Sequence, residues 1–418
     1  RYFHHEKEEF RYGAVILTGG AEPTWVPLTL AENIDDLIIG YHDLLNSHEA
    51  TDVKLEPVLR DLHDKVMTPL RAKLPKEIRT LIISPDGLLS FVSFATLLTK
   101  QDRFLCEDYQ VQYVSSGRDL VLGTKADPAH DRLVMFANPA YDGKPTQVAR
   151  VDGLGTNLRS LDRDELRAGL QFKALAGTQK EADSLRAKAL SWKLKAKLFS
   201  GEAATEASLG NVQSPHILHL ATHGFFLAKE EQKKIDPRLN RLRMSLSNDQ
   251  QRYRGRISNP MYRCGLALTG AQQTLDAWAK DEIPPSENDG ILTAAEASVL
   301  DLKGTWLVTL SACDTGQGEV TDGEGVLGLR RAFIQAGAQN LLLTLWPVSD
   351  KHTPDFMEKF YDQAIQSKNA PKALWEVQRD MMVAERAKQK KSRFGKGIAT
   401  VLAVKRYGPF VMSYQKGK

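Results

Sequence analysis

The chain has 418 residues, of which 42% are hydrophobic and 26% are charged, as in an ordinary globular protein. Its formal net charge of +4 is small for this length and excludes a strong overall attraction to nucleic acid or membranes. Three scattered cysteines exclude a disulfide framework and a structural zinc site, and they favour a reducing compartment, which we expect to be the cytoplasm. No apolar run is long enough to span a bilayer. Since the first residue is Arg1 rather than Met, we expect the chain to be part of something longer.

The first 124 residues predict a compact α/β unit without a convergent set of reactive groups. Alternating and helical spacing of apolar residues indicates three strands and two helices, over residues 12–18, 25–28 and 81–84 and over 34–41 and 58–66. Three histidines lie in polar helical surroundings, so we expect His42, His48 and His63 to be exposed.

A boundary is predicted near the segment KADPAH, residues 125–130, which divides the chain into an amino-terminal half (1–127) and a catalytic half (128–418). A strand over residues 133–137 follows the boundary. Thr178 and Glu181 then form a capping-box pattern that opens a helix. Such alternation of strands and helices favours a three-layer α/β/α sandwich around a mostly parallel sheet.

Two strand-like runs end in residues with reactive side chains. HILHLATHG, residues 216–224, brings His223 to the end of one strand, and Trp306–Leu310 is followed shortly by Cys313. The carboxyl ends of parallel strands build the sites of open α/β sheets, so a Cys-His pair is predicted at this edge. The alternative is a core cysteine, because free Cys is among the most buried residue types.

A charged insertion, residues 227–258, separates the two strands. A nucleic-acid surface would need aromatic residues for stacking, and only Tyr253 accompanies the charges, so we interpret the insertion as a solvated, mobile segment. Residues 259–271 return to apolar character and are expected to pack near the active edge. Thr293 and Glu296 form a second capping box.

The segment after the cysteine predicts further helices and strands. A helix over residues 326–336 is ended by Gly337, and a buried strand covers 341–345. Thr353 is expected to cap a helix that has Pro354 in its first turn. Another helix starts near Pro371 and leads into a basic segment, and two closing strands are predicted at 401–404 and 409–414.

The glycines at 323, 325 and 328 imitate a dinucleotide-binding fingerprint. That fingerprint requires the glycines directly after the strand, whereas here the whole loop from Cys313 to Asp322 intervenes. Glu324 would also repel a pyrophosphate. The sequence therefore disfavours a nucleotide site.

Other chemistries also fit the sequence poorly. His216 and His219 would point to opposite faces of a strand, so they cannot converge with His223 on a metal ion. A phosphatase loop needs an arginine six places after its cysteine, where this chain has Glu319. Ser311 remains an alternative nucleophile, although it faces the wrong way if Cys313 is exposed at the strand tip.

Several segments in a consistent order resemble the CHAT family of caspase-like cysteine peptidases, relatives of caspases, separases and gingipains. They cover nearly the whole chain: SPDGLLSFVSFATL (84–97), GTQKEADSL (177–185), GEAATEASL (201–209), HILHLATHGFF (216–226), NPMYRCGLALTGA (259–271), DGILTAAEAS (289–298), the run from LVTLSACDTGQG to LLLTLWPVSD (307–350) and GPFVMSY (408–414). The charged insertion departs from the family pattern. The tetratricopeptide repeats that usually precede the domain are not in this sequence, which fits an excised fragment.

The resemblance implies a caspase-like fold and a catalytic dyad of His223 and Cys313, with the backbone N–H groups of Gly224 and Cys313 as the oxyanion hole. The histidine then protonates the leaving amine, and no metal or organic cofactor is required. Relatives often prefer a basic residue before the cleaved bond. Acidic residues of the loop could supply the matching charge, although loop solubility and turn formation are the more ordinary explanation; these are Asp314, Asp322 and Glu324.

The resemblance further implies a prokaryotic, cytoplasmic endopeptidase that acts in immunity or regulated cell death. We expect a dedicated protein substrate, such as a pore-forming effector, and activation by a ligand, by a partner or by amino-terminal tetratricopeptide repeats. Neither membrane contact nor direct nucleic-acid binding is expected. The alternative is a non-catalytic signalling scaffold, against which the presence of both His223 and Cys313 argues.

Overall fold

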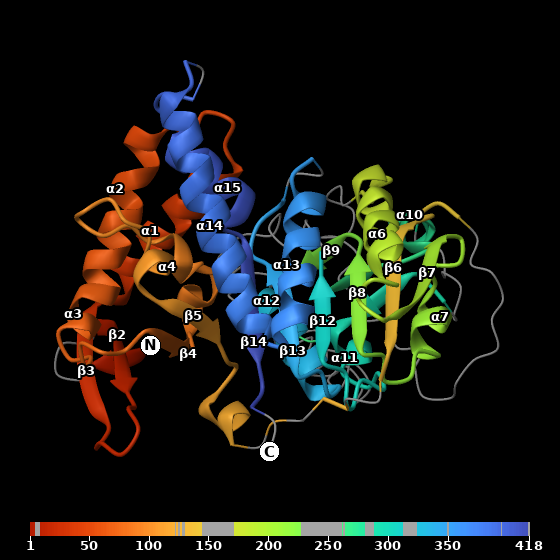
Figure 1. Cartoon of the computed structure of the whole chain (residues 1–418), viewed down its shortest axis with the longest axis horizontal. Coiled ribbons are helices and arrows are strands. Elements are labelled where there is room, and N and C mark those ends of the chain that lie inside the picture. The colour runs from red at the N-terminus through yellow and green to blue at the C-terminus, as the bar shows by residue number, and fades with distance from the viewer. Residues whose placement is uncertain are drawn as a thin grey trace, which may run out of the picture. The chain divides into compact units, whose positions relative to one another are not determined.

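The computed structural model describes residues 1–4, 9–121, 123, 126–127, 130–143, 171–226, 261, 264–280, 288–311, 324–348, 351–393 and 395–416. Within these ranges the protein is an α/β structure built around an eight-stranded sheet (Figure 1). The strand order is β4 (Thr80–Ile83), β5 (Gln110–Tyr113), β14 (Phe410–Tyr414), β13 (Asn340–Thr344), β12 (Leu307–Leu310), β8 (Ile217–Ala221), β6 (Arg132–Pro139) and β7 (Lys195–Gly201).

The large sheet is mostly parallel. Strand β5 pairs in parallel with β4 and β14, β8 pairs in parallel with β12 and β6, and β6 pairs in parallel with β7. Parallel strands need crossover connections, and the helices between them supply these. The predicted fold class, an α/β sandwich with a mostly parallel central sheet, is confirmed.

The chain divides into two compact units. Unit 1 contains residues 1–123 and 342–418, and unit 2 contains residues 124–341. The sequence predicts a different division, into an amino-terminal half (1–127) and a catalytic half (128–418). That division stays a prediction.

Unit 1 combines a small antiparallel sheet with helices. The sheet has the order β1 (Tyr2–His4), β2 (Glu9–Ile16), β3 (Thr24–Leu30). The helices are α1 (Ala31–Asn46), α2 (Asp52–Leu62), α3 (Thr68–Arg71), α4 (Leu105–Asp108), α13 (Thr353–Ser367), α14 (Ala370–Lys391) and α15 (Ala399–Tyr407). Helix α1 shows why they form, because its apolar residues recur every three or four positions and are buried: Ile34, Ile38, Tyr41 and Leu45.

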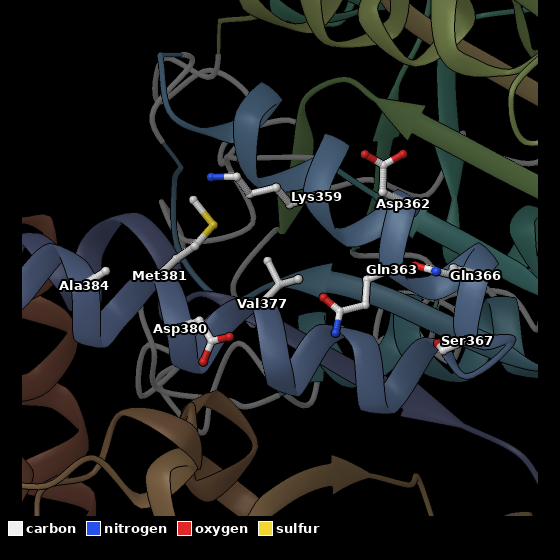
Figure 2. Close-up of a pocket in the computed structure, with 9 residues that line it drawn as sticks. All are labelled: Lys359, Asp362, Gln363, Gln366, Ser367, Val377, Asp380, Met381 and Ala384. Atoms are coloured by element: carbon white, nitrogen blue, oxygen red, sulfur yellow. The ribbon is translucent and has the colours of Figure 1, made fainter.

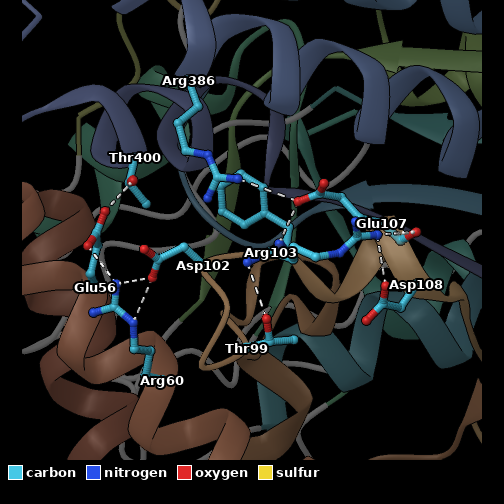
Figure 3. Close-up of polar contacts among 10 residues, drawn as sticks. Glu56, Arg60, Thr99, Asp102, Arg103, Glu107, Asp108, Arg386 and Thr400 are labelled. Carbon is cyan, nitrogen blue, oxygen red and sulfur yellow. Dashed lines mark hydrogen bonds and ion pairs between the residues drawn. The ribbon is translucent and has the colours of Figure 1, made fainter. Parts of the chain in front are cut away.

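A polar network joins helices of unit 1 that are far apart in sequence (Figure 3). Glu56 of α2 accepts a 2.7 Å hydrogen bond from the Thr400 hydroxyl of α15, and Arg60 bonds to Asp102. The guanidinium of Arg386 lies 4.1 Å from the ring centroid of Phe104. These contacts tie the last segment of the chain to its first.

The start of α15 is capped by a distant carboxylate. Asp52 accepts hydrogen bonds from the N–H groups of Ala399, Thr400 and Val401, at 2.9, 2.9 and 3.0 Å. A helix has unpaired N–H groups in its first turn, and a carboxylate there also complements the helix dipole. The strand predicted at 401–404 is therefore wrong, because a tertiary cap overrides the local β-branched pattern.

Two of the three histidines expected to be exposed are buried. His42 and His63 expose 3% and 4% of their surfaces, and only His48 is exposed, as predicted. Nε2 of His42 donates a hydrogen bond of 3.0 Å to the Phe91 carbonyl, and the ring lies edge-on to Trp346. The predicted cap of α13 is also off by one residue, since His352 precedes the helix and Thr353 is its first residue.

Unit 2 carries the strands that the sequence assigns to the site. Its helices are α6 (Ala176–Lys188), α7 (Glu206–Gly210), α10 (Ala271–Ala279), α11 (Ala294–Ala297) and α12 (Glu324–Gln335). A second antiparallel sheet has the order β11 (Ile291–Thr293), β10 (Cys264–Ala267), β9 (Gly224–Phe226). The predicted capping box of Thr293 and Glu296 is confirmed, and Gly337 follows α12 with a φ of +114°.

One glycine allows the second sheet to pack. A Cβ at Gly265 would lie 2.3 Å from the Leu292 carbonyl oxygen and 2.8 Å from the Phe225 ring. Any larger residue would push apart β9, β10 and β11. Because β9 begins directly after His223, this packing also fixes the backbone at the candidate site.

Candidate active site

His223 lies where the sequence predicts it, at the carboxyl end of a strand of the large sheet. Strand β8 ends at Ala221, and β9 starts at Gly224. The main chain of His223 is held by β10, because the Ala267 N–H donates to the His223 carbonyl at 2.8 Å. His223 exposes only 5% of its surface. It is therefore held in a defined position beneath the edge of the sheet.

The imidazole of His223 is oriented by a main-chain carbonyl. Its Nε2 lies 2.7 Å from the carbonyl oxygen of Lys173. A carbonyl oxygen can only accept a hydrogen bond, so Nε2 carries the hydrogen. In the neutral ring, Nδ1 is then the nitrogen that can take up a proton. A histidine held in one tautomer is suited to proton transfer.

Aromatic side chains enclose the imidazole. The ring centroids of Tyr141 and Phe172 lie 5.1 and 5.6 Å from that of His223. The Tyr141 hydroxyl is 2.9 Å from the Thr222 hydroxyl, which bonds in turn to the Ala267 carbonyl. Tyr141 and Phe172 belong to one buried apolar cluster with Phe225, Ala267, Ala271, Leu275 and Ile291. The histidine is thus built on core packing rather than on a surface loop.

The strand that leads to Cys313 lies beside the strand that leads to His223. In the parallel pairing of β12 with β8, Leu310 is opposite Leu220, and the Ser311 N–H donates to the Leu220 carbonyl at 2.9 Å. Cys313, Asp314 and Asp322 lie outside the described residues, and of Glu324 only the backbone is described, as the first residue of α12. Gly224 pairs with Leu266 of β10.

Ser311 is not placed as a nucleophile. It exposes 1% of its surface, and its hydroxyl donates to the Glu181 carboxylate at 3.0 Å. Glu181 exposes only 2% of its surface, so the Ser311 hydroxyl is directed into the protein interior, away from any substrate. Both observations disfavour Ser311 as the nucleophile.

The capping box predicted for Thr178 and Glu181 is wrong. Helix α6 starts at Ala176, so Thr178 and Glu181 lie inside it and do not form a capping box. Thr178 accepts a hydrogen bond from the Asn138 N–H instead, and Glu181 faces the sheet. The signal that could have revealed this is the position of Glu181 in the buried stripe of the helix, next to Ala182 and four residues before Leu185.

The other two histidines of this segment, His219 within β8 and His216 directly before it, have separate surroundings, as predicted. The His216 ring stacks on Trp306 at 5.1 Å, whereas Nε2 of His219 lies 3.2 Å from Glu181. Burial lowers the pKa of His216. Within the described ranges, no group of three His, Cys, Asp or Glu side chains is arranged to hold a metal ion.

Three carboxyl groups gather at the second sheet of unit 2. Burial raises the pKa of Glu206, Asp289 and Glu296, and their mutual repulsion raises the pKa of Glu206 further. Each also accepts main-chain hydrogen bonds, for example Glu206 from the Gly290 N–H at 2.8 Å. These bonds hold the turn before β11, which gives the acidic residues a structural role.

A groove of about 650 Å³ lies elsewhere, in unit 1 (Figure 2). All of its lining side chains come from α13 and α14, and they mix one lysine, two aspartates and several amides with a few apolar groups. The residues that line it include no cysteine and no histidine. The groove does not compete with His223 as a catalytic site.

The mostly parallel α/β sheet, with a fixed histidine at the end of one strand, places the protein in the caspase-like fold class. The chain belongs to the CHAT domain family, whose model matches residues 56–409. It is 27% identical over 332 residues to tetratricopeptide repeat protein 28 of Homo sapiens and 25% identical over 332 residues to that of Mus musculus. Each match covers 77% of this chain and 12% of the relative, so the chain spans a small part of these relatives. In the described part of the chain, no helix is both long and apolar enough for a membrane span.

Proposed function

We propose that the protein is a cysteine endopeptidase in which Cys313 is the nucleophile and His223 transfers the proton. The observation that supports this most directly is the hydrogen bond of His223 to Lys173, because it fixes the tautomer of a histidine at the sheet edge. Leu220 and Leu310 are paired across β8 and β12. His223 and Cys313 each follow their paired leucine by the same number of residues, which favours their meeting at one edge.

The proposed reaction follows from these roles. The thiol proton of Cys313 passes to Nδ1 of His223, and the thiolate attacks the carbonyl carbon of the peptide bond. The backbone N–H groups of Gly224 and Cys313 stabilise the oxyanion that forms. His223 donates a proton from Nδ1 to the amine, the C–N bond breaks, and a thioester remains on the enzyme. Water then hydrolyses the thioester and releases the acid, which restores the thiol. No metal or cofactor takes part.

We further propose a preference for Arg or Lys before the cleaved bond, recognised by Asp314, Asp322 and Glu324. The cellular role proposed is regulated proteolysis in the cytoplasm, in prokaryotic immunity or cell death, with a protein substrate such as a pore-forming effector. The names of the relatives support an association with tetratricopeptide repeats, which would activate the enzyme. In this scheme residues 128–418 form the catalytic half and residues 1–127 a non-catalytic one.

The proposal is tested by covalent labelling with a peptide acyloxymethyl ketone that carries Arg or Lys next to the reactive group. The parent is compared with Cys313→Ala and His223→Ala. Cys264→Ala serves as the matched control, because Cys264 is a fully buried thiol that the reagent cannot reach. We expect labelling at Cys313, its loss in Cys313→Ala, strong slowing in His223→Ala and no change in the control.

Two results of the labelling experiment would contradict parts of the proposal. If Cys313 stays unlabelled with basic, acidic and apolar peptides, and also after tetratricopeptide repeats are restored, the endopeptidase proposal is wrong and a signalling scaffold is the better reading. Labelling by acidic or apolar peptides alone would refute only the basic preference.

A further inference from the structure

We propose that Glu181 is a positioning residue that clamps the end of β12 to β8. One of its carboxylate oxygens faces His219 of β8 and the other accepts the hydroxyl of Ser311, which directly follows β12. His219 precedes His223 by four residues, and Ser311 precedes Cys313 by two. The chemical consequence of the clamp rests on the proposed function, whereas its structural consequence does not.

The geometry of the clamp is that of a shared buried group. Oε2 of Glu181 accepts from the Ser311 Oγ at 3.0 Å. Oε1 lies 3.2 Å from Nε2 of His219, a close polar contact. The side chains of Glu181 and His219 expose 3% and 0%. A carboxylate enclosed this completely is costly unless polar groups surround it, which makes a purely space-filling role a poor explanation.

The segment that leads into α6 contacts the histidine of the candidate dyad. The segment just before α6 supplies both the Lys173 carbonyl that bonds to His223 and the Phe172 ring that packs on it. That segment is fastened to the end of β6, because the Leu175 N–H donates to the Asn138 side chain at 3.0 Å. The segment before α6 therefore contacts His223, and the helix itself contacts Ser311, two residues before Cys313, through Glu181.

A clamp of this kind sets the relative position of two strand ends. The Ser311 N–H already bonds to Leu220 of β8, so Ser311 is held by the neighbouring strand and by the helix above it. If Glu181 is removed, the main chain leading to Cys313 keeps one of these two attachments. Displacements of about 1 Å between catalytic groups are enough to slow a reaction about 100-fold.

The test combines two measurements on the full chain. The first is amide hydrogen exchange at Leu220, Leu310 and Ser311, with the amides of residues 133–137 in β6 as the internal reference. The second is the maximal rate of labelling of Cys313 by the peptide acyloxymethyl ketone, separated from the reagent concentration that gives half that rate. The variants are Glu181→Ala, Ser311→Ala and Glu181→Gln, which keeps an acceptor for Ser311 but loses the charge.

We expect Glu181→Ala to speed exchange at the ends of β8 and β12 at least about tenfold more than in β6, and to lower the maximal labelling rate by about tenfold or more without changing the half-saturating concentration. Ser311→Ala should act in the same direction, and Glu181→Gln should restore part of both effects. The control is Glu385→Gln, which removes another buried carboxylate, one that pairs with Arg406 in unit 1. It should leave both local readouts unchanged.

The outcomes separate the clamp from the proposed function. Uniformly faster exchange through β6, β8 and β12 would show ordinary destabilisation and overturn the clamp, as would a labelled protein whose strand ends exchange at the parental rate. Local loosening in a protein that is never labelled at Cys313 would support the clamp and refute the endopeptidase. If Glu181→Ala does not fold, amide exchange and the maximal labelling rate are compared between Glu181→Gln and Ser311→Ala. The clamp then requires the larger effects in Ser311→Ala.

Discussion

The carbonyl oxygen of Lys173 and Nε2 of His223 are joined by a hydrogen bond of 2.7 Å. Because the acceptor belongs to the main chain, no substitution at position 173 removes it directly. Its position depends instead on what anchors the neighbouring residue, and the Phe172 N–H donates to Oε1 of Gln272 in α10 at 2.8 Å. The orientation of the candidate catalytic histidine therefore depends on helix α10 through Gln272 and the segment of Phe172 and Lys173.

Gln272→Ala is predicted to slow labelling of Cys313 several-fold, since it releases the segment that carries the Lys173 carbonyl. Loss of one hydrogen bond costs about 0.5–1.5 kcal/mol, which corresponds to roughly twofold to tenfold if it is expressed fully in the rate. Gln179→Ala is the control, because it removes only an exposed bond to Asp183. Equal rates for the two variants would show that the segment does not depend on Gln272.

Gly265→Ala is predicted to destabilise the protein. The new Cβ would meet the Leu292 carbonyl oxygen at 2.3 Å, and backbone cannot move aside cheaply, so we expect a loss of about 1–3 kcal/mol in the free energy of unfolding. Gly40→Ala is the matched change in helix α1, where nothing lies within 4 Å. It should stabilise by about 0.5–1 kcal/mol, because alanine favours a helix over glycine. Urea unfolding of both variants measures this, and similar effects would contradict the packing argument.

Asp289→Asn is predicted to change the pH dependence of stability. Burial, assisted by the charge of Glu296, raises the pKa of Asp289 to about 7. Between about pH 3.9, where an unfolded Asp titrates, and about pH 7, the folded state holds a proton that the unfolded state has lost. Stability from this group therefore falls as the pH rises through that window.

Because asparagine cannot ionise, the stability of Asp289→Asn relative to the parent should increase from pH 4 to pH 7 and then level off. Urea unfolding at several pH values gives this difference. Asp36→Asn, an exposed position of α1, controls for the loss of one negative charge. A difference for Asp289→Asn that is constant between pH 4 and pH 8 would rule out the raised pKa.

His42→Gln is predicted to act in the opposite sense. Burial lowers the pKa of His42, although its bond to the Phe91 carbonyl opposes this. The unfolded chain therefore binds a proton near pH 6.5 when the folded state does not, and stability is lost as the pH falls below that value. Glutamine keeps a donor for Phe91 and cannot titrate. The parent should lose more stability than His42→Gln between pH 7.5 and 5.5, and His48→Gln, an exposed control, should follow the parent.

The sequence predicts the strands of the site well, because buried strands such as Ile217–Ala221 and Leu307–Leu310 are short, mostly apolar runs. Those runs also place His223 at a strand end. Local patterns mislead where a distant residue decides the outcome. Residues 401–404 have the β-branched character of a strand, but the helix there depends on Asp52, more than 300 residues earlier.

The same limit explains the errors at individual side chains. His42 lies in a polar helical segment, and its burial comes from contacts such as Trp346, which no local window contains. Glu181 fits two patterns at once, a capping box with Thr178 and a position in the buried helical stripe, and only packing against β8 and β12 decides between them. The role of Lys173 could not be predicted, because it acts through its carbonyl, which every residue has.

Unit 1 is assembled from residues 1–123 and 342–418, with all of unit 2 between them in the chain. During synthesis on the ribosome, unit 2 is therefore complete before α13, α14, α15 and β14 emerge, and the first 123 residues must wait for these elements. Domains generally fold in the order in which they leave the ribosome, and here that order is reversed. Premature termination after residue 341 would leave a finished candidate site attached to an unfinished unit, a species exposed to proteolysis and chaperones.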